Sequence, residues 1–135
     1  MIEEFKGIIP DDSYFLDLPD CICGPEDYKE KIENGIALMG GNINLTSFDG
    51  KKAGKVYQIS VVVNDQAFYQ DIQEISDFVD AENLIILLNT IKASFLPSDD
   101  RSFYALSGEF IDFSIMFITP VQKKELAAQG LIYIQ

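Results

Sequence analysis

Acidic side chains are the residues of this sequence best able to do chemistry. Closely spaced acids fall among turn-forming residues, at Asp11-Asp12, Asp17 with Asp20, and Asp99-Asp100. Carboxylate oxygens bind hard divalent cations, and carboxylate pairs also act as the acid and base of glycoside hydrolysis. None of these pairs has the spacing of a calcium-binding loop. We therefore interpret them as solvated turn formers, and we expect neither a metal site nor a cofactor.

Other catalytic groups are scarce. The sequence has no histidine, which excludes Ser-His-Asp and Cys-His catalysis as well as histidine-ligated zinc. Cys21 and Cys23 are too few for a four-ligand zinc site, and a disulfide between them would close a small, strained ring. We expect them to be reduced thiols with a structural or incidental role. Gly40-Gly41 belongs to no phosphate-binding motif, so we expect a protein that is not an enzyme.

The charge distribution is the most informative feature of the sequence. The chain has 22 acids and 10 bases, a net charge of −12, which disfavours binding to nucleic acid or anionic lipid. Residues 56–91 contain six acids and no base, and residues 7–28 also lack a base. An acidic surface can serve solubility alone, or it can attract a basic protein. On the second interpretation, we predict that the binding surface comprises Asp65, Tyr69, Asp71, Glu74, Asp77, Asp80 and Glu82.

Length and composition indicate one globular domain. The 135 residues are 47% hydrophobic, which suits a single core in a domain of ordinary size. The longest apolar run, residues 84–88, is much too short to cross a membrane. The first residues are acidic where a signal peptide would be basic. We therefore expect a cytoplasmic protein.

Turn signals and hydrophobic spacing predict the elements of the N-terminal half. We expect a short strand at residues 14–18 and a helix at 26–34 that Gly35 ends. Apolar residues 36–39 and the alternation at 43–47 predict β-structure. Asp49-Gly50 favours a hairpin turn, followed by a strand at 56–63.

The C-terminal half has clearer helix signals. The spacing of Phe68, Ile72, Ile75 and Val79 predicts a helix over residues 66–80, with Asp71, Glu74 and Asp77 facing solvent. Asp80 is a predicted N-cap for a second helix at 81–95 with a buried leucine-rich stripe. Strands are expected at 103–106 and 110–118. Thr119 and Gln122 form a capping-box pattern for a last helix that Gly130 ends, and a closing strand is expected at 131–134.

The C-terminal segment resembles a known family. The stretch FSIMFITPVQKKELAAQG, residues 113–130, resembles the end of suppressor-of-fused-like domains, in which an apolar strand leads through a proline-containing junction into a short helix. The helix expected near residues 83–94 falls in a compatible order, so the resemblance covers about a third of the chain. It implies non-enzymatic protein binding, because bacterial members resemble immunity proteins of polymorphic toxin systems. Small acidic immunity proteins commonly neutralise basic nuclease toxins by covering the active cleft.

These observations converge on a specific expectation. We expect one α+β domain, a mostly antiparallel sheet with helices packed on one side. We expect its function to be stoichiometric binding of a basic protein, in the form of a bacterial immunity protein that blocks a nuclease toxin. The alternatives are a small enzyme that uses carboxylates, with or without a divalent ion, and a structural or regulatory subunit.

Overall fold

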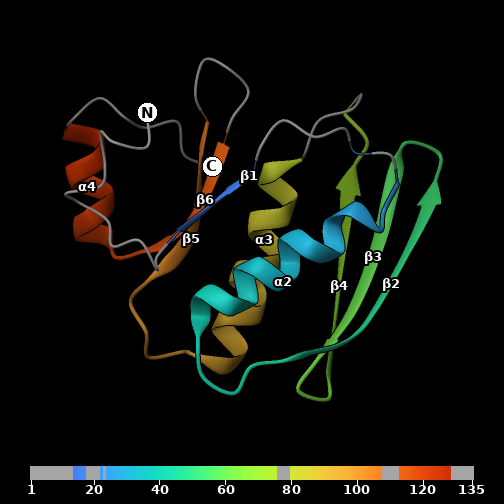
Figure 1. Cartoon of the computed structure of the whole chain (residues 1–135), viewed down its shortest axis with the longest axis horizontal. Coiled ribbons are helices and arrows are strands. Elements are labelled where there is room, and N and C mark those ends of the chain that lie inside the picture. The colour runs from blue at the N-terminus through green and yellow to red at the C-terminus, as the bar shows by residue number, and fades with distance from the viewer. Residues whose placement is uncertain (1–13, 18–21, 23, 76–79, 108–112, 129–135) are drawn as a thin grey trace.

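The computed structural model describes residues 14–17, 22, 24–75, 80–107 and 113–128, which form a single small α+β domain (Figure 1). This confirms the predicted fold class. The elements follow the chain in the order β1 (Tyr14–Asp17), α2 (Asp27–Met39), β2 (Leu45–Ala53), β3 (Val56–Val63), β4 (Gln66–Gln73), α3 (Ala81–Phe95), β5 (Ser102–Ser107), β6 (Phe113–Ile118) and α4 (Pro120–Ala128).

The strands are divided between two three-stranded antiparallel sheets. One has the order β2-β3-β4 and the other β1-β6-β5. Helices α2 and α3 each contact strands of both sheets (Figure 1). The two sheets therefore share one core built around these helices.

Helix α3 joins the edges of the two sheets through polar side chains. Its N-cap, Asp80, accepts a hydrogen bond from the backbone N–H of Gln73 on β4 at 2.8 Å. About two and a half turns further on, Asn89 accepts from the N–H of Phe103 on β5 at 2.8 Å and donates to the same residue's carbonyl at 3.2 Å. Backbone groups that would lack a partner at each sheet edge are thus satisfied by the helix.

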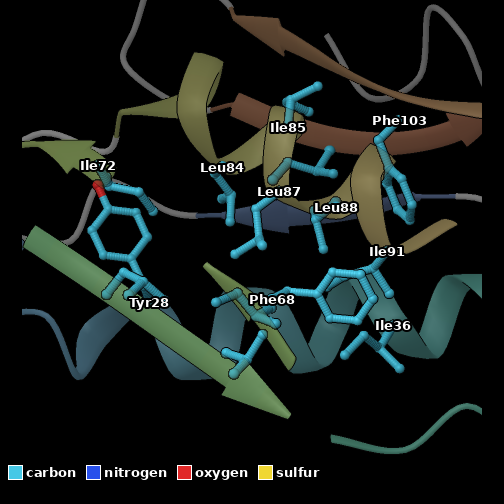
Figure 2. Close-up of a cluster of buried hydrophobic side chains, with 14 of the residues drawn as sticks. Tyr28, Ile36, Phe68, Ile72, Leu84, Ile85, Leu87, Leu88, Ile91 and Phe103 are labelled. Carbon is cyan, nitrogen blue, oxygen red and sulfur yellow. The ribbon is translucent and has the colours of Figure 1, made fainter. Parts of the chain in front are cut away.

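The core is centred on the leucine-rich stripe of α3, as predicted. Leu84, Leu87, Leu88 and Ile91 are essentially inaccessible to solvent. Figure 2 shows them between side chains of α2, β4 and β5, including Tyr28 and Phe68. Because α2, α3 and strands of both sheets contribute to this one cluster, burial of α3 holds the two sheets together.

The β1-β6-β5 sheet is covered on both faces. Phe117 stacks on Phe103 in the main core, with ring centroids 4.6 Å apart. On the opposite face, Met116 is fully buried, and the Lys123 ammonium of α4 lies 4.5 Å from the ring centroid of Tyr104. The predicted capping box is confirmed at the start of α4, where Thr119 and Gln122 exchange two side-chain-to-backbone hydrogen bonds at 2.9 and 3.2 Å.

Helix α2 is longer than predicted. Gly35 does not end the helix, and residues 36–39 continue it rather than forming β-structure. A Cβ at Gly35 would lie only 2.6 Å from Cδ2 of Leu88. Glycine is present here because it lets α2 approach α3 closely, and the helix ends instead at Gly40, which has a φ of 72°.

One turn and one helix predicted from the sequence were wrong. Asp49-Gly50 lies inside β2, and the chain turns at Gly54, whose φ of 63° in a two-residue loop is typical of a type II′ turn. Residues 66–73 form strand β4 and not the predicted helix, because Asn64 and Asp65, with φ of 46° and 67°, make a type I′ turn that returns the chain against β3. The short strand β1, the strand β3 and the helix α3 agree with expectation.

Several predicted features lie outside the described residues. These are Asp11, Asp12, Asp20, Cys21, Cys23, Asp77, Val79, Gly130, residues 110–112 of a predicted strand and the strand at 131–134. Within the described part of the chain, no helix combines the length and apolarity needed to cross a bilayer.

Candidate functional site

Strand β4 sorts its side chains onto two faces. Phe68 and Ile72 point into the core, and Gln70 points the same way and donates to Asn83 of α3 at 3.1 Å. Tyr69 and Asp71 occupy the opposite face. That outer face of the β2-β3-β4 sheet carries two accessible residues of the predicted binding surface.

Tyr69 and Asp71 form a pair on this outer face. Both side chains are exposed, and 56% of the surface of Tyr69 is accessible. Its hydroxyl donates a hydrogen bond to the Asp71 carboxylate, and this bond raises the pKa of the tyrosine hydroxyl. On β3, the residues directly opposite are Ser60 and Gln58, both exposed. Their small or polar side chains leave the tyrosine ring accessible.

Glu74 is engaged within the fold rather than solvated. Its carboxylate pairs with the Lys52 ammonium at 2.6 Å and accepts from the Tyr57 hydroxyl at 3.3 Å. The hydrogen bond from Lys52 is the main reason that the pKa of Glu74 is lowered. This carboxylate ties β2 to the end of β4, and a partner would have to displace Lys52 to use it.

Asp80 is buried, with 4% of its surface exposed. Its carboxylate accepts hydrogen bonds from the N–H of Gln73 and from both the backbone and side-chain nitrogens of Asn83, at 2.6–3.2 Å. Its own backbone N–H donates to the Tyr28 hydroxyl at 2.8 Å. This confirms the predicted N-cap and takes Asp80 out of the accessible surface.

The other predicted acids do not lie beside the Tyr69–Asp71 pair. Asp65 is exposed at the β3–β4 turn, and Glu82 is exposed in the first turn of α3, next to the far end of β4. At about 3.4 Å per strand residue, the length of β4 separates these two acids by roughly 25 Å. The seven predicted residues therefore do not form one cluster.

The remaining described acids provide no metal-binding cluster. Asp99, one of the acids that could have bound a cation, holds the Arg101 guanidinium through three contacts of 2.6–3.2 Å. These bonds lower the pKa of Asp99 to about 2. Across the described ranges, no three His, Cys, Asp or Glu side chains are placed to hold a metal ion. Further exposed acids lie at the N-cap and along α2, namely Glu26, Asp27, Glu30 and Glu33, with the exposed Lys29 among them.

Sequence reasoning missed the strand partners that define the outer face. Ser60 and Gln58 carry no distinctive signal, and the pairing of Lys52 with Glu74 depends on the position of the turn. The dipeptide Gly54-Lys55 was the available signal for the correct turn. A turn there places Lys52 opposite Tyr57, whose hydroxyl donates to Glu74.

No known protein family, curated protein or solved structure shows significant similarity to the chain. Function is therefore inferred from the arrangement of its own side chains.

Proposed function

We propose that this chain is an acidic protein-binding module that inhibits a basic protein by covering it, in the manner of an immunity protein that neutralises a nuclease toxin. The observation that carries the proposal is the exposed Tyr69 ring beside Asp71 on the outer face of a hairpin that has no base between residues 56 and 73. Solvent-exposed aromatic residues are common anchors of protein interfaces.

The chemistry of this surface favours arginine or lysine on the partner. A guanidinium over the Tyr69 ring would gain cation–π attraction, and the neighbouring carboxylate of Asp71 can accept two of its hydrogen bonds. The bond between the two side chains restrains the ring, so less rotational entropy is lost on binding. We name Tyr69, Asp71, Gln58 and Ser60 the Tyr69 surface.

The net charge of −12 supports the same proposal over a longer range. A strongly acidic molecule attracts a basic partner before contact and speeds their encounter. Within the cleft of a nuclease, carboxylates would occupy positions that normally accept phosphates. Asp65 and Glu82, which lie away from the Tyr69 surface, would contribute through this field rather than through contact.

A binding experiment tests the proposal. Immobilised protein would be exposed to a lysate of its source cells, and captured proteins would be purified and titrated by calorimetry. Tyr69→Ala is expected to weaken binding of a basic partner by about 2 kcal/mol, or roughly thirtyfold, as an interface anchor does. Val121→Ala is the matched control, because Val121 is 64% exposed on α4. Capture of only neutral or acidic proteins, or equal effects of the two variants, would contradict the proposal.

A further inference from the structure

The edges of the two sheets differ in how they are covered. Helix α3 bonds to β4 through Asp80 and to β5 through Asn89. Strand β2 has nine residues and lies at the other edge of its sheet, where no described strand pairs with it. In Figure 1, β2 is the outermost strand and its free edge faces away from α2 and α3. A long open edge of this kind is a template for another strand.

The pairing of β2 with β3 determines which backbone groups this edge presents. Ala53 pairs with Val56 across the two-residue turn, so Ser47, Asp49, Lys51 and Ala53 exchange hydrogen bonds with β3, up to the register shift between Leu45 and Ser47. The N–H and C=O groups of Phe48, Gly50 and Lys52 therefore point away from the sheet. They are spaced to accept an antiparallel strand.

The side chains of β2 select one register for a second copy of the same strand. Asp49 and Lys51 are both exposed on the outer face, on either side of Gly50. With a two-fold axis at Gly50, each Asp49 lies opposite Lys51 of the second copy. Moving the register by one residue on each strand would instead place Asp49 opposite Asp49, or Lys51 opposite Lys51, and like charges in this position are destabilising.

We propose that β2 pairs with β2 of a second copy, antiparallel and centred on Gly50, to make one six-stranded sheet across a two-fold dimer. The outward groups of Phe48, Gly50 and Lys52 meet their counterparts in this register and form about six backbone hydrogen bonds. Two Asp49–Lys51 pairs flank the axis. Such an interface is isologous, because the same surface of both subunits is used.

The local charge also favours association at this strand. Residues 49–55 contain three lysines and one acid, whereas the whole chain carries a net charge of −12. Two copies repel each other through most of their surface, and they approach with least repulsion where bases outnumber acids. The Tyr69 surface takes no part in these contacts. Evidence against the dimer would therefore leave the proposed function unaffected, and evidence against the proposed function would leave the dimer unaffected.

Sedimentation equilibrium of charge variants tests the register. Asp49→Lys and Lys51→Asp each place like charges opposite one another twice per dimer, and each is expected to raise the dimer dissociation constant about ten- to fiftyfold. The double variant Asp49→Lys with Lys51→Asp exchanges the charges and should restore wild-type association. If net charge alone controlled association, the two single variants would shift it in opposite directions.

Amide hydrogen exchange provides a second measurement. The N–H groups of Phe48, Gly50 and Lys52 should be protected only at protein concentrations where the dimer forms, whereas those of Asp49 and Lys51 should be protected at all concentrations. A wild-type protein that remains monomeric up to about 1 mM would overturn the proposal. A dimer that tolerates both single charge reversals, or whose β2 amides exchange equally at all concentrations, would also overturn it.

Discussion

The close approach of Gly35 to Leu88 leads to a prediction about stability. Whether Gly35→Ala destabilises or stabilises the protein should depend on the side chain at position 88. A Cβ at position 35 would lie 2.6 Å from Cδ2 and 2.8 Å from Cδ1 of Leu88, which is fully buried. Overpacking of this kind costs about 1–3 kcal/mol. Replacing a mid-helix glycine by alanine gains about 1 kcal/mol of helix propensity. Gly35→Ala should therefore lower the free energy of unfolding by about 0–2 kcal/mol.

The same substitution should have the opposite effect once Leu88 is shortened. Leu88→Ala should cost about 2–5 kcal/mol, since it removes buried methyl groups and leaves a cavity. The methyl group added at position 35 then has room, so Gly35→Ala should stabilise the Leu88→Ala protein by about 1 kcal/mol. The two substitutions are thus expected to couple by about 1–3 kcal/mol.

Urea unfolding of the wild type, the two single variants and the double variant measures this coupling. Equal m-values across the four proteins would show that the comparison is between similar unfolded states. If Gly35→Ala stabilises both backgrounds equally, or if the effects add within about 0.5 kcal/mol, the close packing of α2 on α3 is not as described.

Further predictions concern two aspartates. Asp80→Ala should cost about 2–4 kcal/mol, from the lost N-cap and the unpaired N–H of Gln73, whereas Asp100→Ala on an exposed turn should stay within about 0.5 kcal/mol; urea unfolding compares them. The pKa of Asp99 is lowered by Arg101 to about 2 from an ordinary value of 3.8, so its ionisation stabilises the fold above about pH 4, and this contribution is lost as the pH falls through 2. Asp99→Asn should remove that part of the acid dependence, and an unchanged stability profile between pH 2 and 4 would contradict it.

The sequence predicted an element best where its local signals, such as caps and hydrophobic spacing, agreed with its packing in the folded protein. Helix α3 has a capping aspartate, a continuous apolar stripe and a proline just beyond its end, so its bounds were predicted correctly. The prediction for β4 was wrong because the middle core-facing residue of this strand is the polar Gln70, which bonds to Asn83. Without an apolar residue there, Phe68 and Ile72 are spaced as on a helix. The pairing of β4 with β3 and the bond from Gln70 to the neighbouring helix together explain why this segment is a strand.

Glycine positions show a second limit of local reasoning. Gly35 and Gly50 were assigned to a helix end and a turn, yet both lie inside elements. A Cβ at Gly50 would be 2.7 Å from Cβ of Pro25, as a Cβ at Gly35 would be too close to Leu88. Close approach of two segments and chain reversal both require glycine, and the sequence alone does not separate them.

The candidate surface was predicted only in part for a related reason. Charge spacing identified an acidic stretch, and Tyr69 and Asp71 are exposed within it. Which acids are free depends on partners contributed by other elements, such as Lys52 of β2 for Glu74 and Gln73 of β4 for Asp80. These partners become visible only once β2, β4 and α3 are placed together.

The central claim is that the Tyr69 surface binds a basic protein. Its most direct test is the association rate of the purified partner with wild-type protein and with Asp71→Lys, over a range of salt concentrations. We predict that charge reversal slows association, and that salt slows the wild type more than the variant, because screening acts on the attraction that Asp71 supplies. Asp100→Lys, at an exposed acid elsewhere, should change the rate less. A rate that is independent of salt and equal in wild type and Asp71→Lys would contradict the claim.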